Sequence, residues 1–239
     1  ILGQMEHSHQ TALFSATMPA KIKNIAGRFL SDPKEVRIVP TLNKVELISQ
    51  SYIELSQREK LDVLTRVLEV KQSQGTLIFV RTRNASTELA EKLQARGYLA
   101  SPLNGDLNQS AREKVVSRIK KGGLDIIVAT DVAARGIDVD RINLVVNYDI
   151  PYDVEAYIHR IGRTGRAGRQ GDALLFVTQR ERRLFKLIQS AMGESLVRVE
   201  PPSREDLIRK RDEKLSVEIS RILKYPRKTI AYKELLDSI

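Results

Sequence analysis

The feature that most constrains the fold is an alternation of short apolar segments with amphipathic ones, beginning near Ser49. Apolar runs such as TLIFV at residues 76–80 and DIIVAT at residues 125–130 are continuous and do not alternate with polar residues. Strands of this kind are buried on both faces, as in parallel sheets covered by crossover helices. The pattern therefore predicts an α/β fold, a parallel sheet sandwiched by helices.

The same pattern places the expected elements. The expected strands are residues 51–55, 76–80, 100–104, 125–130, 144–149 and 173–178, and the expected helices are residues 58–70, 84–96, 109–120 and 154–161. Ligands of such sheets bind outside the carboxyl ends of the strands. Polar residues gather there: Arg81, Gly105, Asp106, Thr130 and Asp131. Ordinary loop polarity explains any one of these positions, but explains less well why they share one edge.

The two ends of the chain have a different character. Residues 1–39 contain an expected strand (12–17), a helix (19–30) and a second strand (35–39), and are interpreted as the closing edge of a preceding domain. Residues 40–48 are the expected linker, and residues 49–179 the main domain. Residues 180–239 form an expected helical extension, with helices at 180–192, from Ser203 to about 223, and at 229–239. Its long helix carries a narrow apolar stripe, which must be covered by the domain or by another chain: Leu207, Ile208, Leu215, Ile219, Ile222 and Leu223.

Composition narrows the classes of partner. The 239 residues carry a formal charge of +10, which favours a polyanion, with nucleic acid first and an anionic membrane second. No apolar run reaches the length of a membrane span, and no signal peptide is visible. The absence of cysteine excludes disulfides and thiolate metal sites and agrees with a cytoplasmic setting. His7 and His9 have metal-like spacing, but without a third ligand nearby they are interpreted as a solvated loop.

The segment YIHRIGRTGRAGR, residues 157–169, concentrates four arginines and three glycines in thirteen positions. Guanidinium groups match phosphate oxygens, and glycine lets a ligand approach the backbone closely. A disordered Arg-Gly tract with loose affinity for nucleic acid is the alternative. Because the segment lies between an expected helix and an expected strand, a structured phosphate site is favoured.

The segment ATDVAARGIDV, residues 129–139, leaves a buried strand with small residues. Thr130 and Arg135 are suited to phosphate oxygens, and Asp138 is suited to accept bonds from ribose hydroxyls. An ordinary turn from strand to helix, with Asp138 as a cap, is the alternative.

Together these segments resemble motifs V and VI of the DEAD-box RNA helicases. The resemblance includes SAT (residues 15–17, motif III), LIFVRTR (77–83, motif IV) and LNGDLNQSAREK (103–114), all in family order between Gln10 and Val177. Several segments look most like the bacterial cold-shock and ribosome-assembly branch. The resemblance implies that this chain holds the second RecA-like domain of a cytoplasmic ATP-dependent RNA helicase.

The resemblance also concerns what the sequence lacks. It contains neither a G-x-x-x-x-G-K-[ST] loop nor an Asp-Glu-Ala-Asp tetrad. The family implies that these, with most ligands of ATP and Mg²⁺, belong to a first RecA-like domain upstream. The chain alone is therefore expected to be inactive as an ATPase, and no metal site is expected within it.

The family implies roles for the positions that match its motifs. Arg163 and Arg166 are expected to reach the γ-phosphate as arginine fingers, with Gly136 and Asp138 in the ATP-binding segment. His159 and Arg160 are expected to link motif VI to the first domain and to motif III. The expected coupling residues are Ser15, Thr17, Gln109 and Arg112, and the expected contacts to the RNA backbone are Arg81, Gly105, Asp106, Thr130, Asp131 and Arg135. Arg169 is interpreted as a solvated arginine past the motif.

The implied mechanism is a clamp that closes on ATP and RNA and separates a short duplex. Backbone contacts predict weak sequence specificity and strong salt dependence. The rival hypothesis is a non-catalytic module that binds RNA or forms a homodimer through residues 181–239. A related helicase acting on DNA is a third alternative. Tyr148, Tyr152 and Tyr157 are interpreted as core and cleft residues rather than base-stacking platforms.

Overall fold

The computed structural model describes residues 10–15, 18, 20–36, 47–166, 168–193 and 196–223. The chain forms two compact units, residues 1–41 and 42–239. In the first unit, helix α1 (Ala20–Phe29) confirms the expected helix. The expected strand at residues 12–17 is wrong for residues 12–15, because the described residues of this unit contain no second strand to pair with them. Thr17, residues 37–46, the two N-terminal histidines and the expected helix at 229–239 lie outside the described residues.

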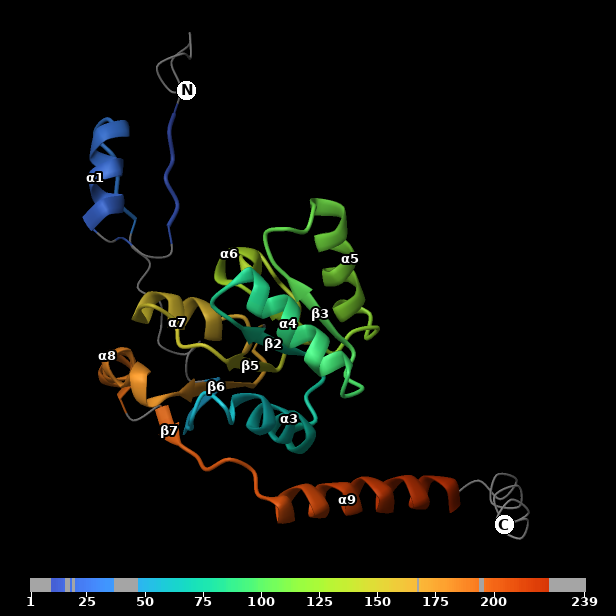
Figure 1. Cartoon of the computed structure of the whole chain (residues 1–239). Helices are drawn as coiled ribbons and strands as arrows, with labels where there is room; N and C mark the ends of the chain where they lie inside the picture. Colours follow the sequence, from blue (N-terminus) through green and yellow to red (C-terminus); the bar gives the residue numbers. More distant parts are fainter. Residues whose placement is uncertain are drawn as a thin grey trace. The chain divides into compact units, whose positions relative to one another are not determined.

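The second unit is built on one seven-stranded sheet in which every pairing is parallel, with the order β3-β4-β2-β5-β6-β1-β7 (Figure 1). The strands are β1 (Ile48–Glu54), β2 (Thr76–Phe79), β3 (Ala100–Leu103), β4 (Ile126–Ala129), β5 (Leu144–Asn147), β6 (Gly171–Val177) and β7 (Leu196–Arg198). The predicted α/β fold with a parallel sheet is thus confirmed.

The helices between the strands are α3 (Lys60–Lys71), α4 (Arg83–Gln94), α5 (Gln109–Lys120), α6 (Asp131–Ala134), α7 (Val154–Ile161) and α8 (Arg182–Met192). Three of them begin with a capping side chain. Thr82, Asn108 and Asp153 each accept a hydrogen bond from the backbone N–H three residues ahead, at 3.1, 2.8 and 2.7 Å. Such caps satisfy donors that have no partner within the helix, so they fix where α4, α5 and α7 begin.

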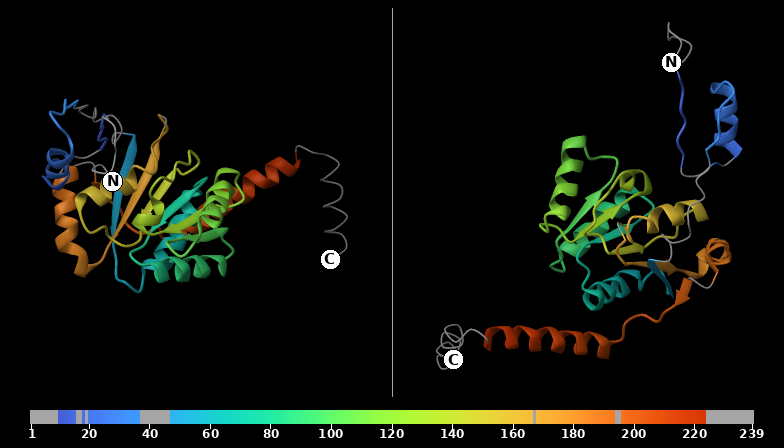
Figure 2. Two further views of the ribbon diagram at one scale, coloured as in Figure 1. Left: turned by 90° about the horizontal axis from the view of Figure 1, so that it is seen from above. Right: turned by 180° about the vertical axis from the view of Figure 1, so that it is seen from behind.

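Alternate residues of the strands enter two cores, one on each face of the sheet. Ile78 and its neighbours on that face pack under α3 and α4. Leu77 and Phe79 point to the opposite face, which α5, α6, α7 and α8 cover. The two views in Figure 2 show this sheet between its layers of helices. Burial on both faces explains why the strand sequences are apolar throughout.

Several features differ from the sequence prediction. Strand β7 was not expected, because three residues are too few to show a hydrophobic period; it pairs with β1 as a parallel strand. A 3₁₀ turn (Gln179–Glu181) precedes α8. Tyr157 is fully buried and Tyr148 packs against the core, as predicted, but Tyr152 is 65% exposed in the turn before α7.

Helix α9 (Arg204–Leu223) confirms the predicted long helix and its cap. The Ser203 hydroxyl accepts a bond from the Asp206 N–H at 3.1 Å, and the Asp206 carboxylate accepts one from the Ser203 N–H at 2.9 Å. The helix packs beside α3, where Arg211 bonds Glu69 at 2.5 Å. Apolar side chains remain exposed along it: Ile208, Leu215, Val217 and Ile219. No helix in the described part of the chain is both long and apolar enough to cross a bilayer.

The sheet ends in two short edge strands. At one edge, β3 contains Pro102, which has no N–H to donate. The Leu99 carbonyl accepts a bond from the Ile126 N–H at 3.0 Å, so Leu99 and Ser101 face β4. Because strand residues alternate, the nitrogen of Pro102 faces the free side of the strand.

Candidate nucleotide and nucleic-acid contacts

The loops after β2, β3 and β4 carry the residues that the sequence places at one edge. These strands are neighbours in the sheet, so their carboxyl ends meet, and the predicted common edge is confirmed. Arg81 follows β2, Gly105 and Asp106 follow β3, and Thr130 and Asp131 follow β4. Thr130 is the N-cap residue of α6, so its side chain lies at the start of that helix.

A buried arginine joins the two motifs. Arg160, on α7, is 3% exposed and forms a bidentate bond to Asp131 at 2.6 and 2.8 Å. It also donates to the Asn147 side chain at 3.1 Å and to the Asp149 carbonyl at 2.6 Å. Its guanidinium lies 5.0 Å from the centre of the Phe79 ring. Most of its donors are therefore used within this unit, where they fix α7 against the start of α6.

The next two arginines of the segment are more accessible. Arg166 donates to the Asp138 carboxylate and, at 3.0 Å, to the Gly162 carbonyl. Arg163 is partly buried and donates to the Ile137 carbonyl at 3.2 Å. The bond from Arg166 holds the pKa of the Asp138 carboxyl below its ordinary value. Burial lowers the pKa of the Arg163 guanidinium and the Arg166 cation lowers it further, although an arginine stays charged.

The spacing of glycine and threonine in this segment has a packing reason. Thr164 is buried and donates to the Ile142 carbonyl at 2.9 Å. Gly165 has φ +65°, and a Cβ there would lie 2.6 Å from Cγ1 of Ile48. A Cβ on Gly171 would lie 2.3 Å from the Thr164 hydroxyl. The turn after α7 therefore needs glycine to approach the strands, and it holds Arg163 and Arg166 beside the sheet.

Arg112 holds the loop that follows α6. It donates to the Ala133 carbonyl and, at 2.6 Å, to the Arg135 carbonyl. The side chain of Arg135 is left exposed at the surface. Gln109 bonds Glu113 at 2.8 Å on the outside of α5. Gly136, with φ +74°, follows in a conformation that L side chains rarely adopt, and a Cβ there would meet open space.

The remaining predicted residues lie apart from these groups. His159 is exposed on α7, and Asp106 forms a surface ion pair with Arg83 at 2.5 Å. Arg169 lies exposed near Asp140, in keeping with a solvated arginine. Ser15 belongs to the first compact unit.

A buried lysine near Arg81 was not predicted from the sequence. Lys60 is 0% exposed and lies 3.2 Å from Asp149 and 3.8 Å from Glu181. The other oxygen of Asp149 accepts a bond from the Arg81 N–H at 2.9 Å, and Glu181 lies 3.6 Å from the Arg81 guanidinium. A lysine in the first turn of an amphipathic helix is normally solvated, and Asp149 lies 89 residues away in sequence, so no local pattern pointed to this role.

These residues fit a nucleotide in chemical terms. Arg163 and Arg166 are cations of the kind that bind phosphate, and Asp138 is an exposed acceptor suited to ribose hydroxyls. Open space over Gly136 leaves the backbone accessible. Within the described residues, no three His, Cys, Asp or Glu side chains are grouped to hold a metal ion.

Comparison with known proteins identifies relatives. Residues 59–168 match the family model described as the helicase conserved C-terminal domain. The chain is 51% identical over 223 residues to the ATP-dependent RNA helicase DeaD of Escherichia coli strain K12, covering 93% of this chain and 36% of the relative. The chain thus spans about a third of the length of the curated relatives it matches.

Solved structures agree with this match. Dbp5 L327V of S. cerevisiae, bound to RNA and ADP BeF3, superposes with a TM-score of 0.72 at 32% identity, covering 86% of this chain and 54% of that one. The E. coli DEAD-box protein SrmB, bound to the regulator of ribonuclease activity A, gives a TM-score of 0.61 at 33% identity, covering 67% of this chain and 93% of that one.

Proposed function

Because the chain belongs to the DEAD-box helicase family and carries its conserved C-terminal domain, we propose that it is the C-terminal part of an ATP-dependent RNA helicase. In this role it contributes one wall of an ATP site and one part of an RNA path. Closure against an N-terminal RecA-like domain brings the two together and remodels short RNA duplexes. RNA, held mostly by its sugar-phosphate backbone, is the proposed substrate.

The cluster of Asp138, Arg163 and Arg166 is the main support for this proposal. Motifs V and VI are separate in sequence, yet the structure joins them through the Arg166–Asp138 ion pair and the bond from Arg163 to the Ile137 carbonyl. We propose that Arg163 and Arg166 bind the γ-phosphate and stabilise the charge that develops during phosphoryl transfer. Asp138 and the backbone at Gly136 then hold the ribose side of the nucleotide. ATP supplies the phosphoryl group, and Mg²⁺ is held mainly by the other domain.

The edge formed by the loops after β2, β3 and β4 is the proposed RNA surface. Arg81, Thr130 and Arg135 present cations or hydroxyls there, with Gly105 and Asp106 beside them, and Arg112 positions the Arg135 loop. Asp131 is proposed to belong to this RNA surface as well, and Arg160, which bonds Asp131, is proposed to link motif VI to the first domain and to motif III. His159, Ser15, Thr17 and Gln109 are proposed to couple the two domains.

Replacement of one arginine finger tests the proposal. In a protein that joins this chain to its N-terminal ATP-binding domain, Arg163→Ala is expected to lower RNA-stimulated ATPase activity by about 10³-fold or more. RNA affinity should be retained, because Arg163 is assigned to the nucleotide cluster and not to the RNA surface. Arg169→Ala, in the same segment, is the matched control and should leave activity near that of the wild type. Equal loss of ATPase activity and RNA affinity would show a role in folding instead.

We further propose that the chain alone does not hydrolyse ATP, since its sequence carries no phosphate-binding loop. RNA-stimulated turnover by the isolated chain would refute this. The division into residues 1–39, 40–48, 49–179 and 180–239 also remains a proposal. A cytoplasmic location and a role in ribosome assembly or cold shock are proposals too. They are supported by the resemblance of the motifs to the bacterial cold-shock and ribosome-assembly branch of the family.

A second function is favoured by α9. Its exposed Leu215, Val217 and Ile219 are apolar side chains that another helix could cover. Dimerisation through this helix is the corresponding proposal. Sedimentation of the chain with and without residues 200–239 tests it, since a monomer in both cases would exclude dimerisation.

A further inference from the structure

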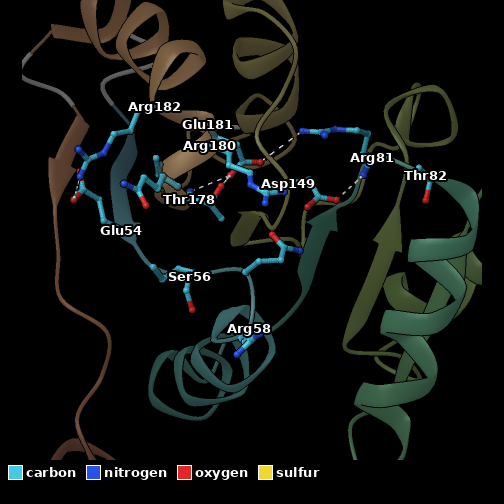
Figure 3. Close-up of a pocket in the computed structure, with 14 residues that line it drawn as sticks. Glu54, Ser56, Arg58, Arg81, Thr82, Asp149, Thr178, Arg180, Glu181 and Arg182 are labelled. Atoms are coloured by element: carbon cyan, nitrogen blue, oxygen red, sulfur yellow. Dashed lines mark hydrogen bonds and ion pairs between the residues drawn. The ribbon is translucent and has the colours of Figure 1, made fainter.

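A large pocket lies beside the proposed RNA edge, over the other half of the sheet. Its volume is about 1230 Å³, and it is lined by the loops that follow β1, β2, β5 and β6 (Figure 3). Arg81 and Thr82, after β2, lie at its border with the edge formed by β2, β4 and β3. The pocket and the proposed RNA edge are therefore parts of one continuous strand-end surface.

The charged side chains at the floor of this pocket are paired with one another. Lys60 lies beneath it, fully buried, between the carboxylates of Asp149 and Glu181. Glu181 also accepts bonds from the Thr178 N–H at 3.0 Å and from its hydroxyl at 2.7 Å. The Arg81 backbone and side chain complete the set, as Figure 3 shows. Both carboxylates are thus already paired and leave little negative charge to repel an incoming anion.

The rim of the pocket keeps free positive charge. Arg182 lies 3.8 Å from Glu54, so that pair largely cancels. Arg58 and Arg180 also line the pocket, both are exposed, and neither has a carboxylate partner within the described part of the chain. With Lys60 included, five cations face three carboxylates. The surplus makes the pocket attractive to a polyanion.

We propose that this pocket binds the phosphodiester backbone of a single RNA strand that continues past Arg81 toward β1. The inference rests on the proposed RNA binding of the chain and adds residues to it. Arg58 and Arg180 contact phosphates, while Ser56, Gln57 and Gln179 offer hydrogen bonds to phosphate and sugar oxygens. The footprint of RNA on this domain is then longer than the β3–β4–β2 edge. Because the pocket is continuous with the proposed RNA edge at Arg81, RNA is favoured over an acidic protein segment as the occupant.

The test compares two RNA lengths in binding to the chain. The probe is a fluorescently labelled oligouridine, either short enough to cover only the Arg81–Arg135 edge or long enough to extend into the pocket. The variant is Arg58→Gln with Arg180→Gln. Binding is followed by anisotropy over a series of salt concentrations.

For the long RNA, the variant should bind several-fold more weakly. The slope of log K against log salt should fall in magnitude by about 1.4, since each phosphate contact to a single strand contributes about 0.7. The short RNA should bind the variant and the wild type equally.

The control is Arg96→Gln with Arg118→Gln, which removes the same charge near the ends of α4 and α5, at the opposite edge of the sheet. If this control weakens long RNA as much as the pocket variant does, the effect is one of net charge and the inference is wrong. Circular dichroism should show that both variants are folded, because all four side chains are exposed.

Two other results would also overturn the inference, and they separate it from the proposed function. If Arg81→Gln weakens both RNAs and the pocket variant weakens neither, RNA binding stands and the pocket has no part in it. If the pocket variant keeps its RNA affinity but loses affinity for poly-glutamate, the occupant is an acidic protein segment. Failure of the wild-type chain to bind either RNA would refute the proposed RNA binding itself, and the inference with it.

Discussion

Arg160 and Arg166 lie six positions apart in one arginine-rich segment, yet they occupy opposite environments. Arg160 is buried and holds Asp131, Asn147 and the Asp149 carbonyl. Arg166 meets a carboxylate, Asp138, that is 74% exposed. The Arg160–Asp131 and Arg166–Asp138 ion pairs both join motif V to motif VI. Only the Arg160–Asp131 pair is shielded from water.

One arginine-rich motif therefore serves two purposes. A buried charge that loses its partner is costly, so the Arg160–Asp131 pair fixes a geometry and cannot easily be exchanged. An exposed pair is worth little, so Asp138 and Arg166 can leave one another for a ligand at small cost. The buried pair thus locates the cluster, and the exposed pair is the part available for binding.

The largest effect on stability is expected for Arg160→Leu. Loss of the Arg160 guanidinium leaves Asp131 without its bidentate partner and Asn147 without a donor, so the free energy of unfolding should fall by about 3–5 kcal/mol. Urea denaturation followed by circular dichroism measures this. Arg166→Leu is the matched control. Similar losses in both variants would contradict this prediction, because they would show that the two pairs are in the same environment.

A neutral buried bond should give an intermediate effect. The Tyr157 hydroxyl donates to Oε1 of Gln50 at 3.0 Å, and Nε2 of Gln50 has no partner among the residues that the structure describes. Tyr157→Phe leaves that amide without a donor, and should lower the free energy of unfolding by about 1–3 kcal/mol. Tyr152→Phe removes an exposed hydroxyl and should change little. A loss in Tyr152→Phe as large as in Tyr157→Phe would show that burial does not decide the cost.

The smallest effect on stability is expected from the exposed Arg166–Asp138 pair. Because Arg166 lowers the pKa of the folded Asp138 carboxyl, the pair stabilises the chain above the unfolded pKa, which is about 3.9. That stabilisation is lost as pH falls through the folded pKa. In Arg166→Gln the carboxyl pKa should rise toward its ordinary value, as read by NMR titration of the Asp138 side chain. An unchanged pKa would mean that the pair does not form in solution.

Periodicity was sufficient to predict the parallel sheet and the helices α5 and α7, because burial on both faces leaves a clear apolar pattern. The shared edge of Arg81, Gly105 and Thr130 followed from the same rule about strand ends. Strand β7 was too short to leave a pattern. The burial of Arg160 and Lys60 could not be predicted, since burial of a cation depends on acids that lie 29 and 89 residues away in sequence.

The free edge of the sheet at β3 affects how copies of this chain can meet. An open strand edge normally invites pairing with another sheet, which leads to aggregates. At β3, the nitrogen of Pro102 faces that free side and has no hydrogen to offer, and the strand is only four residues long. Edge-to-edge growth of the sheet is thereby discouraged at β3.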